Sequence, residues 1–146
     1  MLVDKNTLPL VEMEFMNDTH FEDADLINEI YENIETYEKD KSRTNFENLK
    51  TKYNNWVEHT IVHFKTEEDE MQAKGFFAFP YHKNEHDINL NEIKEVWANF
   101  EKEKDVEKLK NYIEYDLVNW LVNHIKSMDT VTAKFFKTGM SPCGMM

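Results

Sequence analysis

Residues 59–86 read HTIVHFKTEEDEMQAKGFFAFPYHKNEH and contain four of the six histidines in the chain. His63 and Glu67 form an HxxxE pair in this stretch, and His82 and His86 form an HxxxH pair. Residues four positions apart on a helix project from one face, about one turn apart. The fifteen positions from Glu67 to His82 allow one helix to end, a turn to form and another helix to begin. Two such pairs on adjoining helices could converge on one point, and imidazole with carboxylate is a ligand set suited to iron, zinc or manganese.

The composition favours a helical, acidic domain. The chain has 146 residues, 40% of them hydrophobic, and only three glycines and three prolines, so few residues interrupt helices. The formal net charge of -12 is spread along the chain, which argues against nucleic acid or an anionic membrane as a partner, because both require local positive charge. The single cysteine, Cys143, cannot form an internal disulfide, and we interpret it as a free thiol without a function.

Two further patterns bear on location. The first fifteen residues, MLVDKNTLPLVEMEF, lack the basic segment and apolar run of a signal peptide. No stretch approaches the length of apolar sequence that a membrane span requires. We therefore expect a cytoplasmic protein without a membrane partner.

Apolar residues at steps of three and four predict four helices, over about 18–39, 43–74, 81–103 and 106–136. An extended arm over about 1–16, expected to pack across the bundle end, and a loose tail over 137–146 flank them. Asn17 or Asp18 is expected to cap the first helix, and Gly75 to end the second. Short polar turns between the helices predict an all-α, antiparallel up-down-up-down four-helix bundle, formed by a single domain over 1–146.

The spacing of the histidines places them at one level of this bundle. His20 and His63 are 43 positions apart across one hairpin, and His86 and His124 are 38 apart across another. Each arm is then about 20 residues, or about 30 Å, and the ends of each hairpin return to one height. This level lies at the end of the bundle that is expected to carry the second loop and both termini. Asp129 lies five positions after His124, about 140° round an ideal helix, so it joins the same site only if the helix unwinds there, for instance by a π-bulge, or if the two residues approach from different sides.

These residues resemble the hemerythrin family, in particular its single-domain bacterial members. The matching segments are THFEDADLIN around His20, HFKTEEDEM at His63, HKNEH at His82, and WLVNHIKSMD around His124. The resemblance covers residues from about 17 to 135. The order H, HxxxE, HxxxH, HxxxxD is specific because seven ligand positions must fit at once.

The resemblance implies a non-haem di-iron centre with an oxo or hydroxo bridge, and reversible binding of dioxygen for carriage, storage or delivery. Its implied metal ligands are His82, His86 and His124 on one iron, His20 and His63 on the other, and Glu67 and Asp129 as bridges. We expect no catalytic residues, and apolar walls from Phe21, Ile27, Trp56, Trp97 or Trp120 that slow loss of the oxidised iron.

Two alternatives use the same centre: an enzyme with ferroxidase, peroxide or nitric-oxide chemistry, and an oxygen sensor that acts through a partner protein. The sixth histidine, His59, lies one turn before His63 and could be a ligand, a donor behind a ligand, or an ordinary core or surface residue. We expect it to have no direct metal role. Glu68, Asp69 and Glu70 are expected to form a solvated face.

Overall fold

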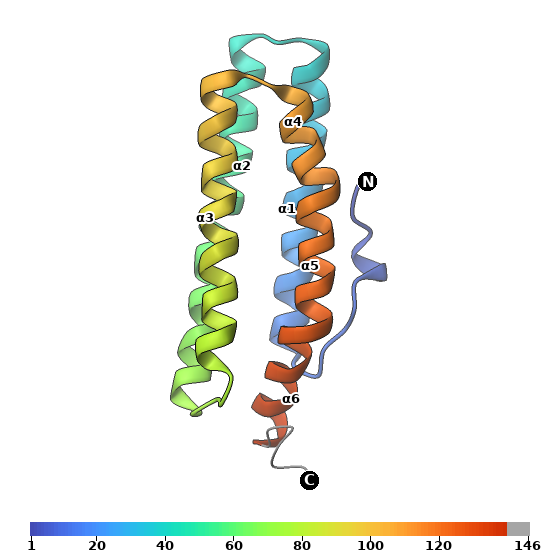
Figure 1. Cartoon of the computed structure of the whole chain (residues 1–146). Helices are drawn as coiled ribbons and strands as arrows, with labels where there is room; N and C mark the ends of the chain where they lie inside the picture. The colour runs from blue at the N-terminus through green and yellow to red at the C-terminus, as the bar shows by residue number, and fades with distance from the viewer. Residues whose placement is uncertain (140–146) are drawn as a thin grey trace.

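The computed structural model describes residues 1–139, and four helical rods in it form an antiparallel bundle (Figure 1). The first three rods are α1 (Glu14–Lys39), α2 (Arg43–Ala73) and α3 (Phe79–Glu103). The fourth rod comprises α4 (Val106–Asn111), a π-helical segment (Tyr112–Leu117), α5 (Val118–His124), a second π-helical segment (Ile125–Asp129) and α6 (Thr130–Thr138). The predicted all-α four-helix bundle is confirmed. The predicted tail beyond 139, with Cys143, lies outside the described residues.

Capping residues begin or end several of the helices close to the residues predicted from the sequence. The hydroxyl of Ser42 accepts a hydrogen bond from the backbone N–H of Asn45, and the carboxylate of Asp105 caps α4 in the same way. Gly75 follows α2 with a φ of +64°, and the N–H of Phe76 reaches back to the carbonyl of Met71. This is the Schellman arrangement, in which glycine accepts the left-handed conformation at little cost.

The start of α1 differs from the prediction. The helix begins at Glu14 rather than near residue 18, and neither Asn17 nor Asp18 caps it. The side chain of Asn17 instead makes two hydrogen bonds to the backbone of Val11. Asn28 holds the backbone of Val3 in the same way. Because these two asparagines fix the arm at two heights of α1, the arm runs along the bundle and not across its end (Figure 1).

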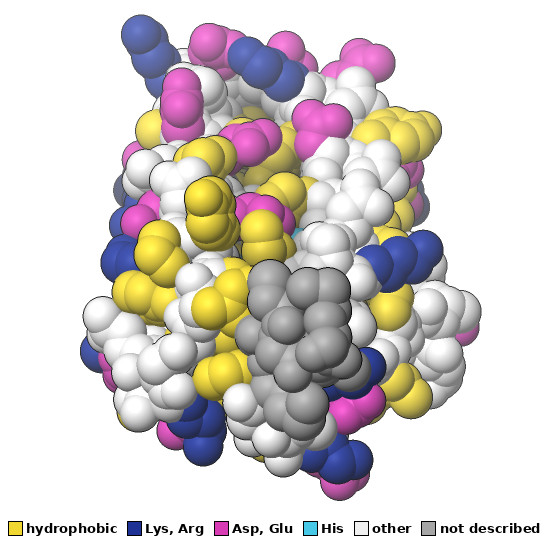
Figure 2. All heavy atoms as spheres, turned by 60° about the horizontal axis from the view of Figure 1, so that its bottom comes forward, with side chains coloured by type: hydrophobic (Ala, Val, Ile, Leu, Met, Phe, Trp, Pro, Cys, Tyr) yellow, Lys and Arg dark blue, Asp and Glu magenta, His cyan; other side chains and the backbone are white. Residues whose placement is uncertain are grey.

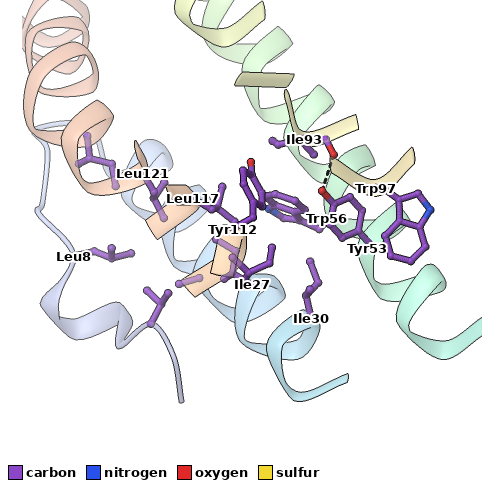
Figure 3. Close-up of a cluster of buried hydrophobic side chains, with 14 of the residues drawn as sticks. Leu8, Ile27, Ile30, Tyr53, Trp56, Ile93, Trp97, Tyr112, Leu117 and Leu121 are labelled. Atoms are coloured by element: carbon purple, nitrogen blue, oxygen red, sulfur yellow. Dashed lines mark hydrogen bonds between the residues drawn. The ribbon is translucent and has the colours of Figure 1, made fainter. Parts of the chain in front are cut away.

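The core fills the middle of the bundle with side chains from all four rods (Figure 3). Tyr53 and Trp56 pack edge to face, with ring centroids 5.3 Å apart. The buried hydroxyl of Tyr53 donates to the carbonyl of Ile93, 2.6 Å away, and so joins α2 to α3. Such a bond satisfies a polar group that would otherwise be buried without a partner.

The end of the bundle with the α2–α3 loop is closed by aromatic side chains. Phe76 is buried and packs against Phe135 of α6, with ring centroids 4.9 Å apart, so this side chain covers part of the bundle end. Phe77 and Tyr81 remain exposed, and Figure 2 shows hydrophobic side chains gathered on this face. None of the helices within residues 1–139 has the length and apolarity that a membrane span requires.

Candidate metal centre

The structure brings together all seven residues that the sequence singled out, and all seven are buried. Their donor atoms form two clusters that share Glu67. The first cluster contains Glu67, His82, His86, His124 and Asp129, and the second contains His20, His63 and Glu67. They lie near the end of the bundle that carries the α2–α3 loop, since His82 is in the first turn of α3 and His63 in the last third of α2.

One side of the site presents three imidazoles to two carboxylate oxygens. The Nε2 atoms of His82 and His124 lie 3.2 and 3.1 Å from Oδ1 of Asp129. The Nε2 atom of His86 lies 3.4 Å from Oε1 of Glu67. We call these three imidazoles and two oxygens the three-histidine group.

The opposite side uses the remaining oxygens of the same carboxylates. The Nε2 atom of His20 lies 2.9 Å from Oδ2 of Asp129, and the Nε2 atom of His63 lies 2.8 Å from Oε2 of Glu67. We call these atoms the two-histidine group. Each carboxylate therefore divides its two oxygens between the two groups, which is the arrangement that a carboxylate bridging two metal ions requires.

The second π-helical segment explains how Asp129 reaches this position. It covers Ile125–Asp129, the five residues that follow His124. A π-turn holds more residues than an α-turn, so a residue five positions on returns close to the starting face. The hydroxyl of Thr130 donates to the carbonyl of Ile125, five residues earlier, and stabilises the wide turn. The local unwinding that the His124–Asp129 spacing demanded is thus present.

Hydrogen bonds behind the three-histidine group orient its rings. The Nδ1 atoms of His86 and His124 lie 2.9 and 2.7 Å from the carboxylates of Glu68 and Glu85, which can only accept. Carboxylate partners of this kind hold the tautomer of metal-binding histidines.

His82 has a hydroxyl partner, and its tautomer follows from the hydrogen count. The Thr132 hydroxyl donates its single hydrogen to the carbonyl of Met128, so it must accept from Nδ1 of His82, 2.7 Å away. Burial also lowers the pKa of His82, which favours the neutral ring. A neutral imidazole protonated at Nδ1 presents the lone pair of Nε2 to the site.

Sequence reasoning missed these three partners, and for Glu68 it was wrong. Glu68 was expected on a solvated face, but its side chain is 17% exposed and serves His86 across the α2–α3 interface. Pairings between rods depend on how far one rod is shifted along the other, which the helical period of a single rod does not reveal. Thr132 does follow Asp129 by three positions, which was a usable sign that it shares the inward face.

Comparison with known proteins identifies two relatives of this chain. The chain is 31% identical over 134 residues to a protein named bacteriohemerythrin from Aquifex aeolicus, covering 92% of this chain and 97% of that protein. The chain belongs to the bacteriohemerythrin family. A second bacteriohemerythrin, from Methylococcus capsulatus, is 29% identical over 116 residues, covering 79% of this chain and 81% of that protein. No protein-family profile and no solved structure gives a significant match.

In this member of the bacteriohemerythrin family, the carboxylates of the metal-free site favour the protonated form of two neighbouring imidazoles. Burial opposes the charged form of His63, but the charge of Glu67 and its hydrogen bond outweigh burial and raise the pKa of His63 to about 9. Burial likewise opposes the charged form of His124, while Asp129 and Glu85 raise its pKa to about 10. These imidazoliums in turn hold the pKa values of Glu67 and Asp129 below their usual range, against burial.

Several donor atoms of the site lack a hydrogen-bond partner that a bound cation would replace. Three buried atoms of the three-histidine group make no hydrogen bond: Oε1 of Glu67, Oδ1 of Asp129 and Nε2 of His86. Leaving a buried polar atom without a partner costs about 1–3 kcal/mol. The Nε2 atoms of His82 and His124 also face each other at 3.2 Å, an approach that requires a proton or a metal between them. A bound cation would satisfy all of these atoms.

A small cavity adjoins both histidine groups. Its volume is about 10 Å³, and it is lined by Asp23, Trp56, Thr60, His63, Phe64, Asn89, Ile93, Leu117, Trp120, Leu121, His124 and Asp129. Of the five apolar walls expected, Trp56 and Trp120 line it. Phe21, Ile27 and Trp97 do not, and Trp97 stacks instead on Tyr53 further along the bundle.

Sequence reasoning also missed two features of this cavity. Phe64 stacks on His86 at 3.8 Å between ring centroids. Asp23, which is buried, accepts a hydrogen bond from the indole N–H of Trp56 at 2.8 Å. The wall is therefore partly polar, contrary to the expected apolar lining.

Proposed function

We propose that this chain binds dioxygen reversibly at a non-haem di-iron centre held by His20, His63, Glu67, His82, His86, His124 and Asp129. The observation that carries the proposal is the division of the Glu67 and Asp129 oxygens between a three-histidine and a two-histidine group. Membership of the bacteriohemerythrin family supports iron as the metal. When bound, two ferrous ions would supply the electrons and the Lewis acidity that dioxygen binding needs.

The two histidine groups offer different numbers of donor atoms. The three-histidine group offers five donor atoms and the two-histidine group four, so the second leaves more room for an added ligand. All five imidazoles are neutral when they bind metal, so the protein contributes only two negative charges directly. Such a set leaves spare positive charge on two divalent ions, which favours ligand binding over the oxidation chemistry of carboxylate-rich bundles.

The size of the buried cavity limits what can occupy the space beside the two histidine groups. A volume of about 10 Å³ is at the lower limit for one water molecule, so the cavity excludes an organic substrate. Two aromatic rings, Phe64 on His86 and Trp120 on His124, shield these two imidazoles from bulk water. Both features support binding of a small neutral molecule.

Reversible optical change on exposure to dioxygen tests the proposal. The protein is reconstituted with Fe²⁺ without oxygen, exposed to dioxygen, and then returned to argon over several cycles. We expect near-ultraviolet and visible bands that appear with dioxygen and vanish without it. Bands that never reverse, or no bands at all, would refute reversible binding. His63→Ala serves as the control and should abolish the cycle while leaving the helical content intact.

One observation favours a second candidate, a reaction with peroxide or nitric oxide. The carboxylate of Asp23 lies in the cavity wall beside His63, where a polar group could exchange protons with a small ligand. Sustained turnover of peroxide or nitric oxide by the iron-loaded protein, reduced severalfold by Asp23→Asn, would support an enzyme. Asparagine keeps an acceptor for the Trp56 indole, so the comparison isolates the carboxyl group.

A further inference from the structure

A groove on the surface between α1 and α2 leads to the two-histidine group. Its volume is about 140 Å³, and it is lined by Phe15, Thr19, Glu22, His59, Val62, His63, Thr66 and Glu67. His63 and Glu67 belong to the proposed metal site, so the groove connects that site with solvent. The small cavity described above also adjoins His63, but it is bounded by a different set of residues.

His59 lines the groove, and neither of its ring nitrogens makes a close hydrogen bond. Its Nε2 atom is buried and makes no hydrogen bond, and its Nδ1 atom is 3.9 Å from Oε2 of Glu22, too far for one. The side chain is 19% exposed, and its ring centroid lies 6.2 Å from that of His63. An imidazole whose two nitrogens lack strong partners is available to a ligand.

The polar groups of the groove all suit a cation. Glu22 is 68% exposed at its outer side and supplies a carboxylate. The hydroxyls of Thr19 and Thr66 donate to the carbonyls of Phe15 and Val62, which leaves oxygen lone pairs free. Among the eight residues that line the groove, none is a lysine or an arginine. Dioxygen is neutral and gains nothing from these charges, whereas a hydrated divalent ion is attracted by them.

We propose that the groove is the route by which Fe²⁺ reaches the site, with Glu22 and His59 as transient ligands that pass the ion to His63 and Glu67. This inference rests on the proposed iron site but not on dioxygen binding. Glu22 attracts the hydrated ion at the surface, and His59 replaces part of its water shell. Two protein donors bind an ion weakly, which suits a position from which it must move on, and imidazole with carboxylate is acceptable to ferrous iron.

The test is the rate of Fe²⁺ uptake by metal-free protein, without oxygen, with ferrous ammonium sulfate as the probe. Quenching of tryptophan fluorescence reports uptake, since Trp120 stacks on His124, and metal analysis reports the final content. We expect His59→Ala to slow uptake about tenfold and Glu22→Gln to slow it about threefold. Glu95→Gln, which removes an exposed carboxylate from α3, should leave the rate unchanged. All variants should reach the iron content and spectrum of the unsubstituted chain.

Two further variants separate a ligand from a passive opening. His59→Phe fills the groove without a donor atom and should be slow, and His59→Asp restores a donor and should recover most of the rate. Uptake by His59→Ala that equals or exceeds that of the unsubstituted chain would overturn the proposal. A lower final iron content in His59→Ala would also overturn it, because His59 would then be a permanent ligand. If the unsubstituted chain takes up no iron, the proposed site itself fails, whereas normal uptake without dioxygen binding refutes only the proposed function.

Discussion

Loading the metal-free protein with a divalent metal should release protons from two identified imidazoles. The pKa values of His63 and His124 are raised to about 9 and about 10, so at pH 8 both rings are almost fully protonated. An ordinary histidine, with a pKa near 6.5, is only about 3% protonated at that pH. Because a metal binds the lone pair of Nε2, both protons must leave, and we expect roughly two protons per chain on loading. A water that ionises between the ions would add one more.

Anaerobic addition of Zn²⁺ to weakly buffered protein at pH 8, followed with a pH indicator dye, counts these protons. Calorimetry in two buffers of different ionisation enthalpy gives an independent count. His63→Gln removes one of the two protonated rings and should lower the count by about one. Release of less than half a proton by the unsubstituted chain, with full metal binding, would show that the imidazoles are neutral beforehand and would refute the electrostatic account.

Three other predictions follow from the same structure. Thr132→Val removes the acceptor of the His82 Nδ1–H group and should weaken metal binding about 10–100-fold, as measured by competition with a chelator. The control Thr36→Val, on the exposed surface of α1, should leave metal binding unchanged. The folded metal-free chain holds protons on His63 and His124 up to a higher pH than the unfolded chain, which releases them near pH 6.5. Its free energy of unfolding should therefore fall as the pH rises toward 10. A constant free energy of unfolding in urea titrations from pH 7 to 10 would contradict this. Tyr53→Phe loses the bond to the Ile93 carbonyl and should cost about 1 kcal/mol in urea unfolding, and no change would show that this bond contributes nothing net.

The sequence was sufficient for the bundle because its signals are local. Ser42, Asp105 and Gly75 fix the rod ends through bonds within a few residues, and the apolar steps identify the inward faces. The path of the arm was not predictable in this way. From the sequence alone, Asn17 is a good candidate for a helix cap. Only the structure shows that its side chain binds the backbone of Val11 in the arm instead.

The site was predictable to the extent that it follows helical spacing. The His63–Glu67 and His82–His86 pairs share faces by virtue of their four-residue steps, and the five-residue step to Asp129 required the π-turn that is present. Contacts between rods were not predictable. Glu68 pairs with His86 and Glu85 with His124 only because α2, α3 and α5 adopt particular relative heights.

The most direct test of the account is anomalous diffraction at the iron edge from crystals of the iron-loaded protein. We predict two iron peaks per chain, one beside His82, His86 and His124 and one beside His20 and His63, with the carboxylates of Glu67 and Asp129 between them. A single peak, or iron bound away from these carboxylates, would contradict the central claim that the two side chains bridge a pair of metal ions.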